Sequence, residues 1–340
     1  MRLLNRRGTL VRLCRMDCTI FTDANSVCPI AIVQDDFLIA ILICDVSTLF
    51  IPCRELVMAR ALVAAEHDLG GLLVKRVLPH QEKRMVGPFI FFDQMGPSDF
   101  PAGRGINVRP HPHIGLSTLT YLFDGSILHR DSLGNHIEIS PGDVNWMTAG
   151  RGIVHSERES FEVRANKHSI SGLQCWIALP EHMAELAPSF AHVKKQDLPH
   201  FIHEGVMMRL VVGEAYGMSS PVKSYSPMFY VDVVASEGSV LDKPDPKQES
   251  AVFVVSGKLT IGGISYTQGD FVLLDEDDKQ IHVEECGRFV MLGGDKFETV
   301  PYMHWNFVSF SKSRIEQAKE DWKNGKFPKI PGDDKEFIPL

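Results

Sequence analysis

The chain has 340 residues, of which 44% are hydrophobic and 23% charged, as in a soluble globular protein with room for two domains. Its net charge of −8 argues against a nucleic-acid surface, which needs clustered basic residues, and favours a small molecule or a protein as partner. The seven cysteines form no Cys-x-x-Cys pair, and we interpret all of them as reduced thiols of a cytoplasmic protein.

Residues 1–66 differ in character from the rest of the chain. Their apolar run at 37–44 lies between aspartates and is far too short to cross a bilayer, which takes about 20 residues. Aspartates between the early arginines and this run also argue against a signal peptide. We expect an extension that is disordered or translated from an upstream start, with Met58 as the native initiator. A peptide preceding Met58 in protein from the native host would contradict this.

From Leu72 onward, short strands alternate with turns. Gly-Pro, Asp-Gly and Pro-Gly-Asp sequences separate runs of apolar, β-branched and aromatic residues. These runs cover residues 72–77, 86–92, 116–123, 126–130, 136–140 and 144–148. Strands of this length and frequency predict an antiparallel, all-β sandwich or barrel.

Two pairs of metal-competent side chains occur in this part of the chain. His111 and His113 lie in a Pro-His-Pro-His segment, and His155 and Glu157 lie in His-Ser-Glu. Residues two apart on an extended strand share a face. If the two strands lie side by side with these faces inward, three imidazoles and one carboxylate converge. Such a set suits Fe(II) or another first-row divalent ion and leaves coordination positions open.

The order of these motifs resembles that of the cupin jelly roll, in which a His-x-His motif and a later Pro-Gly-Asp motif carry the ligands. Within that superfamily the chain is similar to the pirin family of bicupins. The segments that carry the resemblance are 85–93 (MVGPFIFFD), 109–116 (RPHPHIGL), 141–157 (PGDVNWMTAGRGIVHSE) and 305–309 (WNFVS). The resemblance extends from about residue 72 to the C-terminus and implies an all-β fold of two cupin (jelly-roll β-barrel) domains.

A second all-β block follows the first. Its segment Val254–Ile261 echoes Leu119–Ile127, but the region before Ala251 has no histidine, and His282 is the only imidazole in its strands. A C-terminal helix is expected at about 313–324, with Ser313 in a capping box. We therefore expect an extension at 1–66, a metal-binding cupin domain at 67–190, a metal-free cupin domain at 191–310, and a short C-terminal helix and tail at 311–340.

Several other residues have two possible roles. His129 and His136 lie on the strands between the ligand pairs, where each could orient a ligand or face solvent. We expect His136 to face solvent, and both roles stay open for His129. Four phenylalanines are expected in the core, although one or two could line a pocket for a flat ligand: Phe89, Phe91, Phe92 and Phe123.

The resemblance implies two alternative functions. The first is a metal-dependent dioxygenase that opens a flavonol such as quercetin with O₂. His111, His113, His155 and Glu157 would hold one divalent metal ion, expected to be Fe(II), and Glu157 would be the catalytic base. The second is a non-catalytic, iron-binding regulatory protein that acts through protein partners. Neither function involves a membrane or direct contact with nucleic acid.

Overall fold

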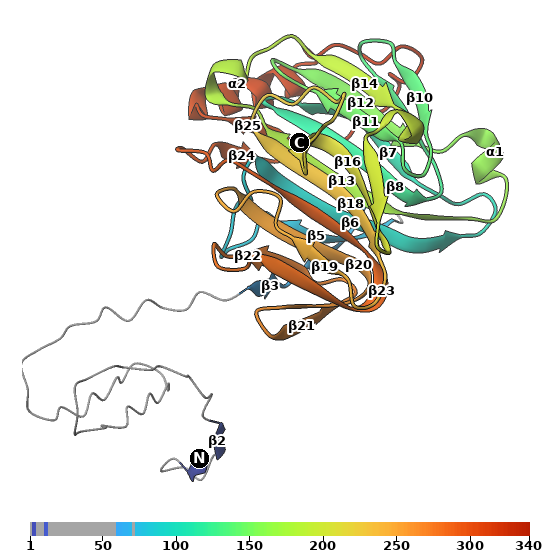
Figure 1. The fold of residues 1–340 in the computed structure, drawn as a ribbon. Coiled ribbons are helices and arrows are strands. Elements are labelled where there is room, and N and C mark those ends of the chain that lie inside the picture. The colour runs from blue at the N-terminus through green and yellow to red at the C-terminus, as the bar shows by residue number, and fades with distance from the viewer. Residues whose placement is uncertain (1, 5–9, 13–58, 70–71) are drawn as a thin grey trace, which may run out of the picture. The chain divides into compact units, whose positions relative to one another are not determined.

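The computed structural model describes residues 2–4, 10–12, 59–69 and 72–340. The expected start at Met58 and most of the expected extension lie outside these residues. Two short strands, β1 (Arg2–Leu4) and β2 (Leu10–Arg12), pair antiparallel in a first compact unit, residues 1–55. A second unit, residues 56–340, carries all the other described helices and strands (Figure 1).

The first half of this second unit consists of two sheets. Its strands are β4 (Ala65–Asp68), β5 (Leu73–Leu78), β6 (Phe89–Phe100), β7 (Asn107–His113), β8 (Leu116–Asp124), β9 (Ile127–Asp131), β10 (His136–Ile139), β11 (Val144–Thr148), β12 (Ile153–Arg158), β13 (His168–Ala178) and β14 (Ser189–Val193). The smaller sheet has the order β10-β9-β12-β7, and the larger has β14-β11-β8-β13-β6-β5-β4. Two hydrophobic clusters, around Trp176 and Ile127, contain residues of both sheets, so the sheets pack face to face.

The second half is built on one large antiparallel sheet. Its strands are β3 (Arg60–Leu62), β15 (His200–His203), β16 (Val206–Ala215), β17 (Met218–Ser219), β18 (Met228–Ala235), β19 (Val240–Asp242), β20 (Glu249–Ile261), β21 (Ile264–Thr267), β22 (Phe271–Leu274) and β23 (Gln280–Gly294). The main order is β15-β16-β18-β23-β20-β22-β3, and β19 pairs with β23. Strand β3 falls within the expected extension and pairs with β22. The four-part division of the chain stays a prediction.

Helices are few and short. The first is α1 (Phe161–Arg164), which projects from the first half in Figure 1. After the hairpin β24 (Tyr302–His304) and β25 (Phe307–Ser309) comes α2 (Lys312–Lys323). Ser311 caps α2, because its backbone is extended and its side chain accepts a hydrogen bond from the Arg314 N–H. The predicted cap at Ser313 was therefore wrong, since that residue lies inside the helix.

Two further expectations concern cysteines and membranes. Cys175 is buried and Cys286 exposed, and both are free thiols. The other five cysteines lie outside the described residues. No helix in the described ranges is long and apolar enough to span a membrane.

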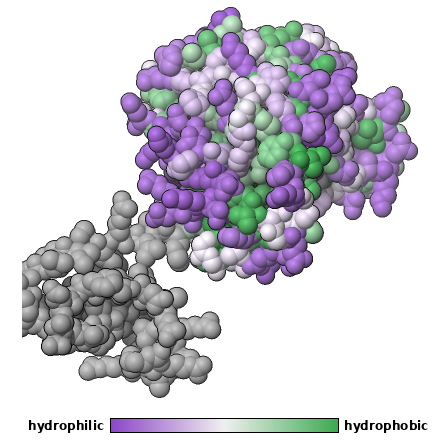
Figure 2. Space-filling model, in the orientation of Figure 1, coloured by the Kyte–Doolittle hydropathy of each residue, from purple (hydrophilic) through white to green (hydrophobic). Residues whose placement is uncertain are grey.

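Strand β20 lies between two hydrophobic clusters. Ala251 and Phe253 belong to a cluster shared by both halves, whereas Val252 and Val254 belong to a cluster inside the second half. The strand is thus buried on both faces, which accounts for its uninterrupted apolar run. In contrast to the buried apolar run of β20, the face of the molecule shown in Figure 2 is largely hydrophilic.

A buried polar network crosses the shared core. The fully buried Asp232 on β18 accepts two hydrogen bonds from Arg288, at 2.8 and 2.6 Å, and one from the Tyr121 hydroxyl at 2.7 Å. Tyr121 lies on β8 of the first half. The Arg288 guanidinium also lies 4.2 Å from the centre of the Phe123 ring. The network therefore joins the two halves through buried polar contacts within their shared hydrophobic cluster.

We expect Arg288→Ala to lower the free energy of unfolding by about 3–5 kcal/mol, because it leaves the Asp232 carboxylate buried without its cation. Urea titration followed by tryptophan fluorescence would measure this. A matched control is Arg314→Ala, whose ion-pair partner Glu185 is exposed, and for which about 1 kcal/mol or less is expected. Equal losses in the two variants would contradict the importance of the network.

Candidate metal centre

Three imidazoles meet on the inner face of the smaller sheet. Strands β7 and β12 pair antiparallel, with His155 opposite His111 and Ile153 opposite His113. One ring nitrogen from each of the three histidines lies within 4.8 Å of the other two. The ring centres are 4.3 to 5.1 Å apart, and all three side chains are buried. The structure thus brings together three of the four predicted ligands.

The ring nitrogens of this cluster are suited to a metal ion. His111 Nδ1 donates a hydrogen bond to the Arg109 carbonyl at 2.8 Å, which leaves Nε2 as the nitrogen with a free lone pair. Both ring nitrogens of His155 are buried and have no hydrogen-bond partner among the described residues. A buried polar atom without a partner is costly, and a bound cation would satisfy it. The residues present therefore fit a divalent metal.

The protonation state of the cluster also favours metal binding. Burial lowers the pKa of His111 to about 4 and lowers the pKa values of His113 and His155 well below 6.5. All three rings are therefore neutral at pH 7. Neutral imidazole is the form that donates its lone pair to a metal.

Glu157 lies on β12, the strand of His155, but it is not part of the group of three imidazoles. The pairing of β12 with β7 is irregular after His155, so that Glu157 lies opposite Val108 instead of Arg109. Its carboxylate is not among the ligand atoms that all lie within 4.8 Å of one another. Burial raises the pKa of this carboxyl to about 7. Its roles as fourth ligand and as base stay predictions.

A buried histidine paired with an aspartate borders the cluster. His129 is buried, its ring centre lies 5.3 Å from that of His155, and its Nε2 is 3.1 Å from Asp131 Oδ2. Its ring also stacks on Phe190 at 4.4 Å. His129 therefore does not face solvent, whereas His136 is exposed as expected. Asp131 was not predicted to lie near the site, although its i, i+2 spacing from His129 matches that of the ligand pairs.

An aromatic wall stands beside His113. Trp176 meets the His113 ring edge to face at 5.0 Å, and Phe91 stacks on Trp176 at 3.9 Å. The Arg76 guanidinium lies 4.3 Å from the Phe91 ring centre and donates two hydrogen bonds to Asp93, both of 2.8 Å. Of the four phenylalanines considered for a pocket, Phe91 is thus the one next to the cluster. Trp176 was not predicted as part of the site.

Comparisons with known proteins agree with this architecture. The pirin family model matches residues 71–177, and the model of the pirin C-terminal cupin domain matches residues 230–328. A pirin-like protein of Caulobacter vibrioides is 45% identical over 282 residues, which make up 82% of this chain and 97% of that protein. The chain belongs to the pirin family. The predicted all-β fold with two cupin domains and a C-terminal helix is confirmed.

Two other pirin relatives extend the comparison. Human pirin is 32% identical, over 75% of this chain and 88% of its own length. Among solved structures, the crystal structure of a quercetin 2,3-dioxygenase from Acinetobacter baumannii is 33% identical, with a TM-score of 0.77. The match covers 83% of this chain and 95% of that one.

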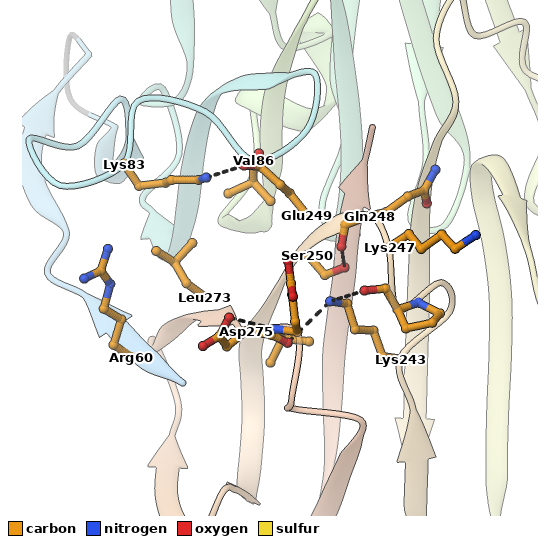
Figure 3. A pocket seen from close by; sticks show the side chains of 13 residues that line it. Arg60, Lys83, Val86, Lys243, Lys247, Gln248, Glu249, Ser250, Leu273 and Asp275 are labelled. Carbon is orange, nitrogen blue, oxygen red and sulfur yellow. Dashed lines mark hydrogen bonds and ion pairs between the residues drawn. The ribbon is translucent and has the colours of Figure 1, made fainter. Parts of the chain in front are cut away.

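The pirin C-terminal domain has a different arrangement at the corresponding strands. Lys243 directly follows β19 and borders a cavity of about 230 Å³ (Figure 3). This lysine is buried, and its ammonium donates to the Pro246 and Asp275 carbonyls, both at 3.4 Å. Lys83 and Val86 of the first half also line this cavity, no histidine or cysteine does so among the described residues, and His282 is exposed. The absence of a metal from this half stays a prediction.

We expect His155→Ala to weaken metal binding by at least about 100-fold, because loss of an outer partner of a ligand already costs about 10–100-fold. Elemental analysis of protein purified without chelators, followed by titration with metal, would measure this. His136→Ala, at an exposed histidine on the neighbouring β10, is the control and should keep full affinity. Equal metal content in the two variants would contradict the proposed site.

The metal-free protein should lose stability in mild acid. The unfolded imidazoles take up protons near pH 6.5, whereas burial lowers the pKa of the folded His111 to about 4 and the pKa values of His113 and His155 well below 6.5. Below pH 6.5 the unfolded state therefore binds more protons, and the free energy of unfolding falls as the pH drops. The slope is up to about 1.4 kcal/mol per pH unit for each imidazole.

Urea titrations between pH 7 and 4.5 in the presence of a chelator would measure this slope. His155→Ala should have a slope smaller by about one proton, whereas His136→Ala should match the wild type. A pH-independent difference between wild type and His155→Ala would contradict the depressed pKa.

Proposed function

We propose that this pirin is a metal-dependent dioxygenase that opens a flavonol such as quercetin with O₂. The observation that carries the proposal is the group of three buried, neutral imidazoles, together with the buried Glu157 two residues after His155, whose carboxyl has a pKa raised to about 7. A likeness to the Acinetobacter baumannii quercetin 2,3-dioxygenase supports the choice of substrate. The proposal includes Fe(II) as the metal and the cytoplasm as the location.

In this proposal His111, His113 and His155 hold the metal, and Glu157 is the fourth ligand or lies next to it. When bound, the metal supplies Lewis-acid polarisation of a chelating substrate and a path for electrons to O₂. Burial of the histidines keeps them neutral, so protons do not compete for their lone pairs. Fewer than six protein ligands leave coordination positions open for substrate.

Glu157 acts as the base in this mechanism. A carboxyl with a pKa near 7 is substantially ionised at neutral pH and still basic enough to accept a proton. Its proton would come from the flavonol hydroxyl next to the ring carbonyl. Removal of that proton makes the flavonol electron-rich and thus reactive toward O₂.

The aromatic wall orients a flat substrate. Trp176 and Phe91 form a stacked pair, and Trp176 directly contacts a predicted ligand, His113. Phe91 is covered by Trp176 and by the Arg76 guanidinium, so Trp176 is the ring of this wall that would contact a planar polyphenol next to His113. Such an aromatic contact would add about 0.5–1.5 kcal/mol beyond area burial, which would favour flat aromatic molecules over small aliphatic ones.

We expect Glu157→Gln to retain metal and to lower the turnover of quercetin by about 10²–10⁴-fold, because the proton acceptor is lost. Oxygen uptake by the metal-loaded protein would measure turnover, and elemental analysis would measure metal. Glu138→Gln, at an exposed glutamate on β10, is the matched control and should be unaffected.

Full activity of Glu157→Gln would overturn the role of that residue as base. If the wild type binds metal but takes up no oxygen with any flavonol, the dioxygenase proposal fails. A metal-sensitive protein partner found in that case would favour the alternative, an iron-binding regulatory protein.

A further inference from the structure

The end of the chain returns to the sheet that bears the histidines. We call residues 325–340 the strap. The Ile338 N–H donates to the Pro110 carbonyl at 2.9 Å, next to His111. Among the described strands, β7 is an edge strand of its sheet, and β25 forms a bridge to Ile114 just past its end. The strap therefore occupies part of an edge that would otherwise be open.

Apolar contacts hold the strap in place. Phe327 stacks against Phe307 of β25, and Ile330 is buried. The indole N–H of Trp322, in α2, donates to the Ile338 carbonyl at 3.0 Å. Phe327 also lies against Gly152, where an added Cβ would be only 3.0 Å from its ring. The strap is thus a packed layer on the outside of the first half.

Asp333 makes the polar contact that matters most for the metal centre. Its Oδ2 accepts a hydrogen bond from the Ser156 hydroxyl at 2.7 Å. Ser156 lies between His155 and Glu157, and its side chain points to the opposite face of β12. Both carboxylate oxygens of Asp333 also accept hydrogen bonds from Arg158, at 2.9 and 2.8 Å. Asp333 therefore accepts hydrogen bonds from two residues of β12, Ser156 and Arg158.

These contacts lie at a β-bulge in the pairing of β12 with β7. Strand β7 has one extra residue between the partners of His155 and Glu157, so Ser156 has no regular partner on β7, although it is paired with Arg130 of β9 on the other side. A bulge interrupts the ladder locally, so on the side of β7 the backbone at Ser156 is not fixed by regular pairing. The hydrogen bond from Ser156 to Asp333 supplies an anchor at that residue.

We propose that Asp333 is a positioning residue of the metal centre, through which the strap fixes β12 against β7 and thereby sets the spacing between His155 and the other two histidines. This rests on the metal centre proposed above. Asp333 acts through the backbone and touches neither the metal nor the substrate. Outer contacts of this kind set ligand geometry and metal affinity.

The test uses Asp333→Asn in the full chain, with Co(II) alone as the probe. The visible absorption of bound Co(II) reports the number and geometry of its ligands, and its titration reports affinity. We expect Asp333→Asn to bind Co(II) about 10–100-fold more weakly and with altered absorption bands. Ser156→Ala removes only one hydroxyl, keeps Arg158 paired, and should alter the bands in the same direction.

The matched control is Glu336→Gln. Glu336 also accepts a hydrogen bond from Arg158, at 2.9 Å, but it is exposed and does not contact Ser156. This variant should keep the wild-type affinity and spectrum. Wild-type Co(II) affinity and spectrum in both Asp333→Asn and Ser156→Ala would overturn the positioning role. A wild type that binds no Co(II) would instead overturn the metal centre itself.

Discussion

The antiparallel pairing of β7 with β12 is the constraint on which the site depends. It places His155 directly opposite His111, and the pleat turns His113 to the same side. Burial then keeps all three rings neutral, and neither ring nitrogen of His155 has a hydrogen-bond partner among the described residues. Such an arrangement costs stability unless something binds there. The surrounding sheets and the interface between the halves must offset that cost.

Much of this could be predicted from the sequence, because it follows from local rules. Turn residues between short apolar runs indicate an all-β fold, and an i, i+2 spacing puts His111 and His113 on one face. What could not be predicted depends on tertiary contacts. The register shift that places Glu157 opposite Val108 has no signature in its own segment. The N-cap of α2 at Ser311 likewise depends on where β25 ends, two residues before it.

The two halves use the same kind of strand pair in different ways. In the first half the inner face of β7 and β12 carries imidazoles next to polar and aromatic side chains. In the second half, Leu241 of β19 and Ile281 of β23 lie in a closed apolar core. Lys243, at the end of β19, binds two loop carbonyls through its ammonium. The Lys243 ammonium thus links two loops of the second half.

The strap also bears on how the protein is made. Its residues, together with β25, whose Val308 N–H donates to the Ile114 carbonyl at 3.1 Å, complete the outer layer around the ligand strands. A ribosome synthesises these segments after both His111 and His155. The outer contacts of the ligand strands can consequently form only once the strap has been synthesised.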